Sequence, residues 1–221
     1  MLAKDMITDV VPPLKTSDTG QQALNMMEVF RISHLPIVNN DVFLGLISES
    51  DIYDLNEAEE PIGNHKLSFA RPYVYQSQHI YEVIELGSRL KLSIVPVLDE
   101  KDNYVGMITM HDITGYLADL LSLKHPGAII VLELTPNNYT LSEIARIIEG
   151  NDAKILSLYI KSSDESSRFE LTLKVNKTEI TSIISAFERY NYQIKAFYSE
   201  QSDLTDLYNE RYDLLMKYLN I

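Results

Sequence analysis

An internal repeat limits what this chain can fold into more than any other feature of its sequence. Residues 34–38 read HLPIV and residues 45–52 read GLISESDI, while residues 94–98 read IVPVL and residues 106–113 read GMITMHDI. The match continues upstream at the same offset of about 60 residues, to Ser33 and Ser93 and to Ala23 and Val83. Two copies of one small unit can pack about a pseudo-twofold axis, and the clefts between them then come in pairs. We therefore expect function to lie between the copies.

Both repeats follow one plan of a helix, two short strands and a second helix. In the first repeat, Ser17 and Asp18 predict the cap of a helix that runs to about Arg31. Short apolar runs around Pro36 and Pro96 predict the strands. The remaining expected elements are strands 35–38, 42–47, 94–98 and 104–108, and helices that begin at Ser48, near Ile80 and at Thr109. Residues 57–64 between the repeats predict a solvated linker.

The sequence beyond His125-Pro126-Gly127 has a different pattern. It predicts the order β-α-β-β-α-β, which is the ferredoxin-like unit. A capping-box match at Thr140 starts the first helix, with Leu141, Ile144, Ile147 and Ile148 facing inward, and Asn176 is expected to cap the second. Residues 203–219 carry one apolar stripe and predict an amphipathic helix that docks on its own chain or on a partner.

These patterns define the expected fold class and domains. The fold is mixed α/β (α+β), with a paired repeat module over residues 1–125, a ferredoxin-like domain over 126–200 and a C-terminal helix over 201–221. Within the module, the first repeat covers about 1–60 and the second about 61–125.

Composition excludes several classes of function. The 221 residues carry a net charge of −13, and so acidic a surface repels nucleic acid and anionic membranes, which bind through Lys and Arg. The chain has no cysteine, so disulfides, thiolate nucleophiles and thiolate metal sites are excluded. No apolar run approaches the ~20 residues of a membrane helix, and residues 1–5 do not lead into a signal core. We expect a cytoplasmic protein with no nucleic-acid or membrane partner.

The strongest chemical candidates are the pairs Ser48/Asp51 and Thr109/Asp112, each three residues apart at the start of a helix. The pattern S/T-x-x-D is typical of a capping box, in which the hydroxyl caps backbone amides and the carboxylate suits the helix dipole. The same geometry also suits a ligand, because a carboxylate there can accept both hydrogens of a ribose diol. The spacing alone favours the capping interpretation.

Three basic or imidazole side chains lie near these motifs in the sequence. Arg31 and Lys91 occupy equivalent places and could reach a phosphate, but basic residues at helix C-termini more often complement the dipole. His34 precedes an apolar strand, so we expect it to be packed or hydrogen-bonded rather than a metal ligand. The sequence predicts no metal site.

The doubled motif, preceded in each copy by a strand that contains proline, resembles a tandem pair of CBS (cystathionine-β-synthase-type) domains over about residues 1–122. That resemblance implies two inter-repeat clefts that bind adenosyl compounds such as AMP, ADP, ATP or S-adenosylmethionine. By position in the family motif, Asp51 and Asp112 would hold ribose hydroxyls. The other implied ligand-binding residues are Ser48, Thr109, Ile32, Ser33, Leu92 and Ser93. Because the copies differ in their opening strands and in His34 against Ile94, we expect the two clefts to bind unequally.

The C-terminal unit resembles an ACT domain over about residues 128–200. Family members that bind amino acids usually carry a glycine in the first turn, whereas this chain has Pro136-Asn137-Asn138-Tyr139. The difference favours a role in dimerisation or signalling. A CBS pair followed by an ACT-like unit is the arrangement of acetoin-utilisation accessory proteins, which the chain resembles overall.

The sequence therefore favours a homodimeric regulatory protein with no catalytic residues. It would bind an adenosyl compound, require no cofactor and relay the change to a protein partner. The alternative is an interaction or dimerisation scaffold whose clefts are vestigial, because serine stands in both copies where many nucleotide-binding members carry Arg or His. An enzyme is disfavoured because the chain has no Gly-x-Ser-x-Gly elbow, phosphate loop or zinc-spaced histidine pair.

Overall fold

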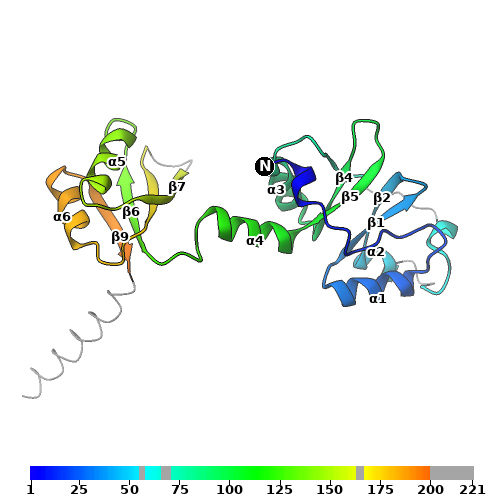
Figure 1. Ribbon diagram of the computed structural model, residues 1–221. Coiled ribbons are helices and arrows are strands. Elements are labelled where there is room, and N and C mark those ends of the chain that lie inside the picture. Colours follow the sequence, from blue (N-terminus) through cyan, green and yellow to red (C-terminus); the bar gives the residue numbers. More distant parts are fainter. Residues whose placement is uncertain (55–57, 66–70, 163–166, 200–221) are drawn as a thin grey trace, which may run out of the picture. The chain divides into compact units, whose positions relative to one another are not determined.

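The two sequence repeats fold together. The computed structural model describes residues 1–54, 58–65, 71–162 and 167–199, and the chain divides into two compact units, Met1–Tyr116 and Leu117–Ile221 (Figure 1). The helix expected over 203–219 lies outside the described residues. The elements of the first repeat are η1 (Ala3–Met6), α1 (Gly20–Phe30), β1 (His34–Asn39), β2 (Val42–Ser48) and α2 (Glu49–Asp54). They are followed by η2 (Ile62–Asn64), β3 (Val74–Tyr75), α3 (Ile80–Leu90), β4 (Ile94–Leu98), β5 (Tyr104–Thr109) and α4 (Met110–Leu120), which crosses the boundary between the units.

The backbone pairing repeats with the sequence. Leu14 forms a parallel bridge with Ile37, and 60 residues later Val74 of β3 pairs in parallel with Val97 of β4. Strands β1 and β2 are antiparallel, as are β4 and β5, and the register of each hairpin shifts directly after Ile37 or Val97. The shared irregularity shows that the two copies have the same local geometry and not merely the same order of elements.

Equivalent residues of the two copies meet at a pseudo-twofold axis. The rings of Phe43, the second residue of β2, and Tyr104, the first residue of β5, stack with centroids 6.3 Å apart and planes 25° apart. Val42 bridges to Asn103 beside them, and the Tyr104 amide donates to the Asp41 carbonyl at 2.7 Å. Contacts between equivalent positions require a twofold arrangement, so the expected symmetry of the module is present.

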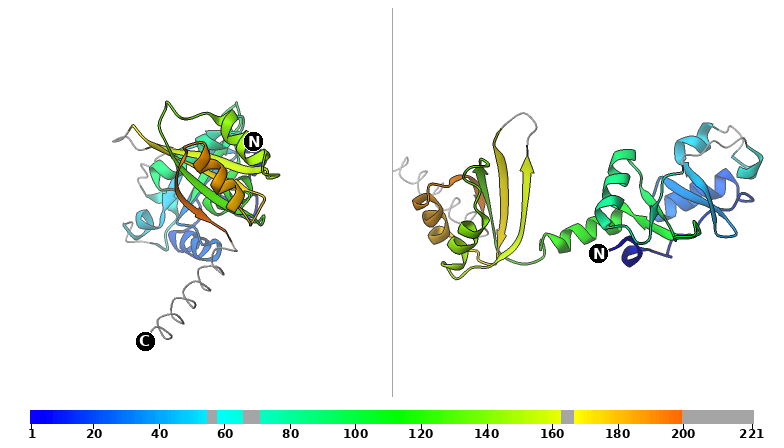
Figure 2. Two further views of the ribbon diagram at one scale, coloured as in Figure 1. Left: turned by 90° about the vertical axis from the view of Figure 1, so that its left-hand side faces the viewer. Right: turned by 90° about the horizontal axis from the view of Figure 1, so that it is seen from above.

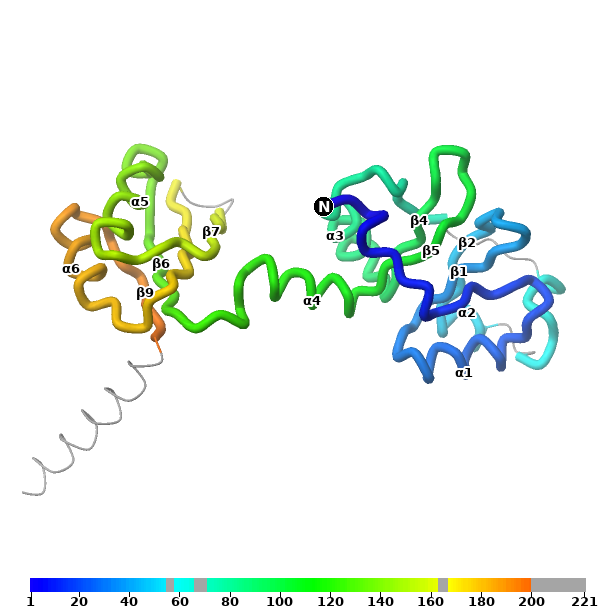
Figure 3. The backbone as a smooth tube through the Cα atoms, in the orientation of Figure 1, coloured from blue at the N-terminus to red at the C-terminus, as the bar shows by residue number. Residues whose placement is uncertain are grey.

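The segment that leads into each repeat packs on the other repeat. Near η1, the Ala3 amide donates to the Gln78 carbonyl at 2.9 Å, beside the start of α3 (Figure 3). Near η2, the Ile62 amide donates to the Asp18 carbonyl at 2.8 Å, beside the start of α1. The expectation of a solvated linker over residues 57–64 was therefore wrong for Ile62. This residue is fully buried because the segment at η2 packs on the first repeat.

Two predicted helix caps were also wrong. Helix α1 is capped by Thr19, whose hydroxyl accepts from the Gln22 amide at 3.2 Å, because the Asp18 carboxylate is occupied by the Lys15 amide at 2.7 Å. Asn176 does not cap a helix, because its side-chain oxygen accepts from the Lys154 amide at 2.7 Å. The following helix begins five residues later, at Thr181.

The second unit has the predicted order of elements. These are β6 (Ala128–Leu134), α5 (Leu141–Glu149), β7 (Ile155–Ser162), β8 (Phe169–Val175), α6 (Thr181–Arg189) and β9 (Gln193–Tyr198). The strands form one antiparallel sheet in the order β7-β8-β6-β9, and both helices cover one of its faces (Figure 2). This strand order is that of the ferredoxin-like fold, so the predicted fold class is confirmed.

Helix α5 buries most, but not all, of the apolar side chains that the sequence pattern predicts to face inward. Ile144, Ile147 and Ile148 are buried as predicted, but Leu141 is 44% exposed. Thr140 is the N-cap, yet its side chain makes no capping hydrogen bond. The carboxylate of Glu143, which would complete a capping box, accepts instead from the Tyr192 hydroxyl at 2.9 Å.

Candidate ligand site between the two repeats

The turn at Ser48 joins β2 to α2 and holds the first predicted carboxylate. The Ser48 amide and hydroxyl both donate to Asp51 Oδ2, at 2.8 and 2.7 Å, and the Asp51 amide lies 3.2 Å from Ser48 Oγ. This is the capping geometry that the spacing favoured. Among the described residues, no hydrogen bond ends on the other carboxylate oxygen of Asp51, and the residue is exposed.

The turn at Thr109 repeats this arrangement between β5 and α4. Thr109 Oγ1 donates to Asp112 Oδ2 at 2.6 Å and accepts from the Asp112 amide at 3.0 Å. Thr109 is only 9% exposed and Asp112 is half-buried, so this turn is the more enclosed of the two. In the part of the chain that the structure describes, Asp112 also accepts hydrogen bonds on Oδ2 alone. Each turn thus presents a fixed carboxylate with one oxygen available for a hydroxyl donor.

The two pre-strand serines connect the turns across the repeat interface. The Glu49 amide donates to the Ser33 carbonyl at 3.1 Å, and the Met110 amide donates to the Ser93 carbonyl at 3.0 Å. The Ser33 amide in turn donates to Ser93 Oγ at 3.0 Å. A continuous path of hydrogen bonds therefore runs from one carboxylate turn to the other, so that Ser33, Ser48, Asp51, Ser93, Thr109 and Asp112 form one cluster in the first unit.

His34 is a member of this cluster that the predicted site omitted. Its Nδ1 accepts from the Ser93 amide at 3.3 Å and lies 3.1 Å from the hydroxyl oxygens of Ser33 and Ser93. Burial lowers the pKa of the imidazole below its ordinary value of 6.5, against an opposing effect of the Asp51 carboxylate. The expectation that His34 is hydrogen-bonded is confirmed. The contrast between His34 and Ile94 in otherwise matching segments was the sequence signal for its place in the site.

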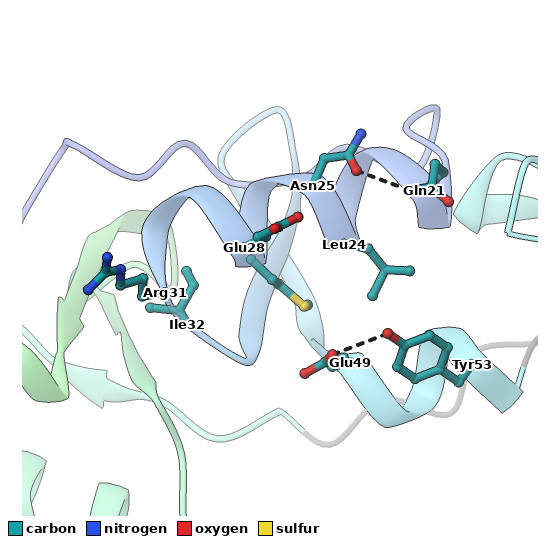
Figure 4. Close-up of a pocket in the computed structure, with 9 residues that line it drawn as sticks. Gln21, Leu24, Asn25, Glu28, Arg31, Ile32, Glu49 and Tyr53 are labelled. Atoms are coloured by element: carbon teal, nitrogen blue, oxygen red, sulfur yellow. Dashed lines mark hydrogen bonds between the residues drawn. The ribbon is translucent and has the colours of Figure 1, made fainter.

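Ile32 and Leu92, also predicted as ligand-binding residues, close the preceding helices. The amide of Ile32 donates to the Met27 carbonyl at 3.0 Å, and that of Leu92 donates to the Gly87 carbonyl at 2.9 Å. Leu92 is 9% exposed. Ile32 lines a cavity of about 520 Å³ between α1 and α2, together with Leu24 and Tyr53 (Figure 4). Ile32 therefore contributes to a groove between the two helices of its own repeat.

Arg31 and Lys91 are the C-cap residues of α1 and α3. Both have left-handed backbone conformations, with φ of 54° and 53°, and both are exposed. Such a residue after the last helical turn lets the following amide reach back to a helical carbonyl. The interpretation of these two side chains as helix-terminal residues agrees with their position.

Neither a membrane-spanning helix nor a metal-binding cluster is present among the described residues. No helix among them is long and apolar enough to cross a membrane. No group of three or more His, Asp or Glu side chains in the described ranges is arranged to hold a metal ion.

Comparison with known proteins places the first half of the chain in a family. Residues 3–57 and 70–119 match the family model of the CBS domain. Over 116 residues the chain is 28% identical to inosine-5'-monophosphate dehydrogenase of Methanocaldococcus jannaschii; the match covers 51% of this chain and 22% of that enzyme, so the chain spans about a fifth of this curated relative's length.

Two solved structures are also similar to the chain. A putative acetoin utilization protein (AcuB) from Vibrio cholerae is 28% identical with a TM-score of 0.48, over 56% of this chain and 95% of that one. A CBS domain pair/ACT domain protein from Thermotoga maritima is 23% identical with a TM-score of 0.48, over 55% and 99%. From the two matches to the family model, together with the repeated fold, we conclude that the first half of this chain is a pair of CBS domains.

Proposed function

We propose that this protein is a non-catalytic sensor whose CBS pair binds an adenosyl compound in clefts between the repeats. The candidates are AMP, ADP, ATP and S-adenosylmethionine. The observation that carries the proposal is the pair of Ser/Thr–Asp turns, which are joined through Ser33 and Ser93 and each keep one carboxylate oxygen without a hydrogen bond from the described residues. Asp51 and Asp112 hold ribose hydroxyls through charge-assisted hydrogen bonds, and Ser48 and Thr109 fix the carboxylates.

The proposed mechanism is a shift in how the two repeats pack. A ligand bound at one carboxylate turn is coupled to the other repeat, because the hydrogen-bonded path crosses their interface at Ser33 and Ser93. It can change the packing only by its difference in affinity for the two arrangements. The C-terminal unit, which we propose to be an ACT-like domain, then relays the change to a protein partner. We further propose a cytoplasmic homodimer with domains over 1–125, 126–200 and 201–221.

Thermal unfolding with added ligands tests this function. At a free ligand concentration of about 100 times Kd, binding adds about 2.7 kcal/mol of stability. For a chain of this size, that raises Tm by several degrees, at roughly 2–4 °C per kcal/mol. We expect at least one of AMP, ADP, ATP and S-adenosylmethionine to raise Tm by this amount. Unchanged melting with all four, and with NAD, would contradict the proposal.

The second candidate function is a scaffold with vestigial clefts, favoured by the apolar stripe over residues 203–219 of the sequence. A chain truncated after residue 200 separates the two functions. If the protein is a sensor, ligand-induced melting shifts persist in the truncated chain. If it is a scaffold, no ligand shifts Tm in either chain, and truncation abolishes the dimer measured by light scattering. An unchanged oligomer without ligand shifts would count against the scaffold.

A further inference from the structure

The repeat interface contains one hydrogen bond that breaks its twofold symmetry. The Ser33 amide donates to the hydroxyl of Ser93. The equivalent amide, that of Ser93, does not donate to the hydroxyl of Ser33 but to Nδ1 of His34 at 3.3 Å. In the second repeat the residue equivalent to His34 is Ile94, which is fully buried and offers no acceptor. One ionisable ring therefore closes the interface on one side only.

The hydrogen bond from the Ser93 amide requires Nδ1 of His34 to be an acceptor. A backbone amide is always a donor, so Nδ1 must carry a lone pair, and the neutral ring then carries its hydrogen on Nε2. In the imidazolium form both ring nitrogens are donors. The hydrogens of Nδ1 and of the Ser93 amide would then point at each other. A protonated His34 would therefore lose the hydrogen bond from the Ser93 amide, and its Nδ1 hydrogen would turn to the hydroxyl oxygen of Ser33 or Ser93, each 3.1 Å away.

Burial and a neighbouring charge both act on the His34 ring. Asp51 on α2 is the described carboxylate that acts on His34, and it favours the protonated form. Glu49 on the same helix is turned into the groove between α1 and α2, where it accepts from the Tyr53 hydroxyl at 3.3 Å (Figure 4). Arg31 and Lys91 are exposed at their helix ends. Burial of the ring lowers the pKa of His34, whereas Asp51 raises it, and burial has the larger effect.

We propose that His34 is a proton-operated latch between the two CBS domains, closed when the ring is neutral and opened when it is protonated. We further infer that a phosphate carried by a ligand at Asp51 opens the latch, because added negative charge near the ring favours the imidazolium. The first part stands on the interface contacts alone. The second part rests on the proposed function, and it supplies a route from ligand binding to altered packing of the repeats.

Nuclear magnetic resonance of the full chain without ligand tests the latch. We expect the His34 ring to titrate below 6.5, and the amide signal of Ser93 to move with the same midpoint. In the variant His34→Asn, the side-chain oxygen accepts from the Ser93 amide but does not titrate, so the Ser93 signal loses this pH dependence. The control His125→Gln, at an exposed histidine of the second unit, keeps it. A Ser93 amide that does not respond to pH, or responds equally in His34→Asn, would overturn the latch.

A second arm compares AMP with adenosine on the unmodified chain, at concentrations where melting shifts show that both bind. We expect AMP to raise the midpoint of the His34 titration and adenosine to leave it nearly unchanged. Equal midpoints with both bound would overturn the ligand-coupled part. If AMP does not bind, the ligand-coupled part fails for AMP, the melting screen with ADP, ATP and S-adenosylmethionine decides the proposed function, and the titration without ligand still decides whether the latch exists.

Discussion

Replacement of Asp51 or Asp112 by asparagine is expected to lower the affinity of its own cleft for an adenosyl ligand by about 10- to 100-fold. A hydrogen bond to a charged group contributes about 1.5–3 kcal/mol, and each 1.4 kcal/mol is roughly a factor of ten in Kd. The asparagine oxygen still accepts from Ser48 or Thr109, so the turns that both carboxylates now close should survive. Isothermal titration calorimetry with the best ligand from the melting screen measures the effect.

The control for this result is Asp41→Asn, which removes the same charge from the β1–β2 turn. Asp41 has a left-handed backbone with φ of 65°, a conformation that asparagine adopts readily. We expect the control to bind like the unmodified chain. Undiminished binding in both Asp51→Asn and Asp112→Asn would show that the two carboxylates do not bind the ligand.

In the unmodified chain we expect the two clefts to bind the ligand with unequal affinity. A titration that shows two identical sites would refute that expectation.

Replacement of Gly106 by alanine is expected to destabilise the first unit by roughly 2–6 kcal/mol. Gly106 in β5 has φ of +148°, and a Cβ atom there would overlap the Cγ2 methyl of Ile7. Backbone strain of this kind costs about 1–3 kcal/mol, and overpacking costs typically about 1–3 kcal/mol more. The clash also falls beside the Thr8 amide, which donates to the Met107 carbonyl at 2.9 Å and holds the N-terminal segment on the second repeat.

Gly115→Ala is the matched control, because a Cβ atom at that position in α4 meets nothing within 4 Å. Glycine in a helix interior is less stable than alanine by about 0.5–1 kcal/mol, so this variant should gain stability. Hydrogen–deuterium exchange of peptides from β5, with calorimetry on the full chain, compares the two variants. Equal protection in Gly106→Ala and in the unmodified chain would show that the N-terminal segment is not held at this point.

Much of the fold could be predicted because local patterns specify it. The hairpins around Pro36 and Pro96 and the order β-α-β-β-α-β follow from short apolar runs and turn residues. The predicted caps failed where a side chain had a second choice of partner. Asp18 binds the Lys15 amide and Asn176 binds the Lys154 amide, so neither caps a helix. The choice between such partners depends on the positions of neighbouring backbone amides in the folded chain. The capping propensity of a residue type contains no information about those positions.

The sequence by itself determined the doubled Ser/Thr–Asp turns, since each is closed by hydrogen bonds between residues three apart. Only the tertiary structure decided what surrounds them. The segment at Ala3 leads into the first repeat but packs on the second, and the segment at Ile62 leads into the second repeat but packs on the first. These contacts join residues that are far apart in the chain. So does the contact of His34 with Ser93, across 59 positions. Such contacts form because two copies of one unit bury a shared interface about an axis, and where that axis falls is set by packing rather than by any local run of residues.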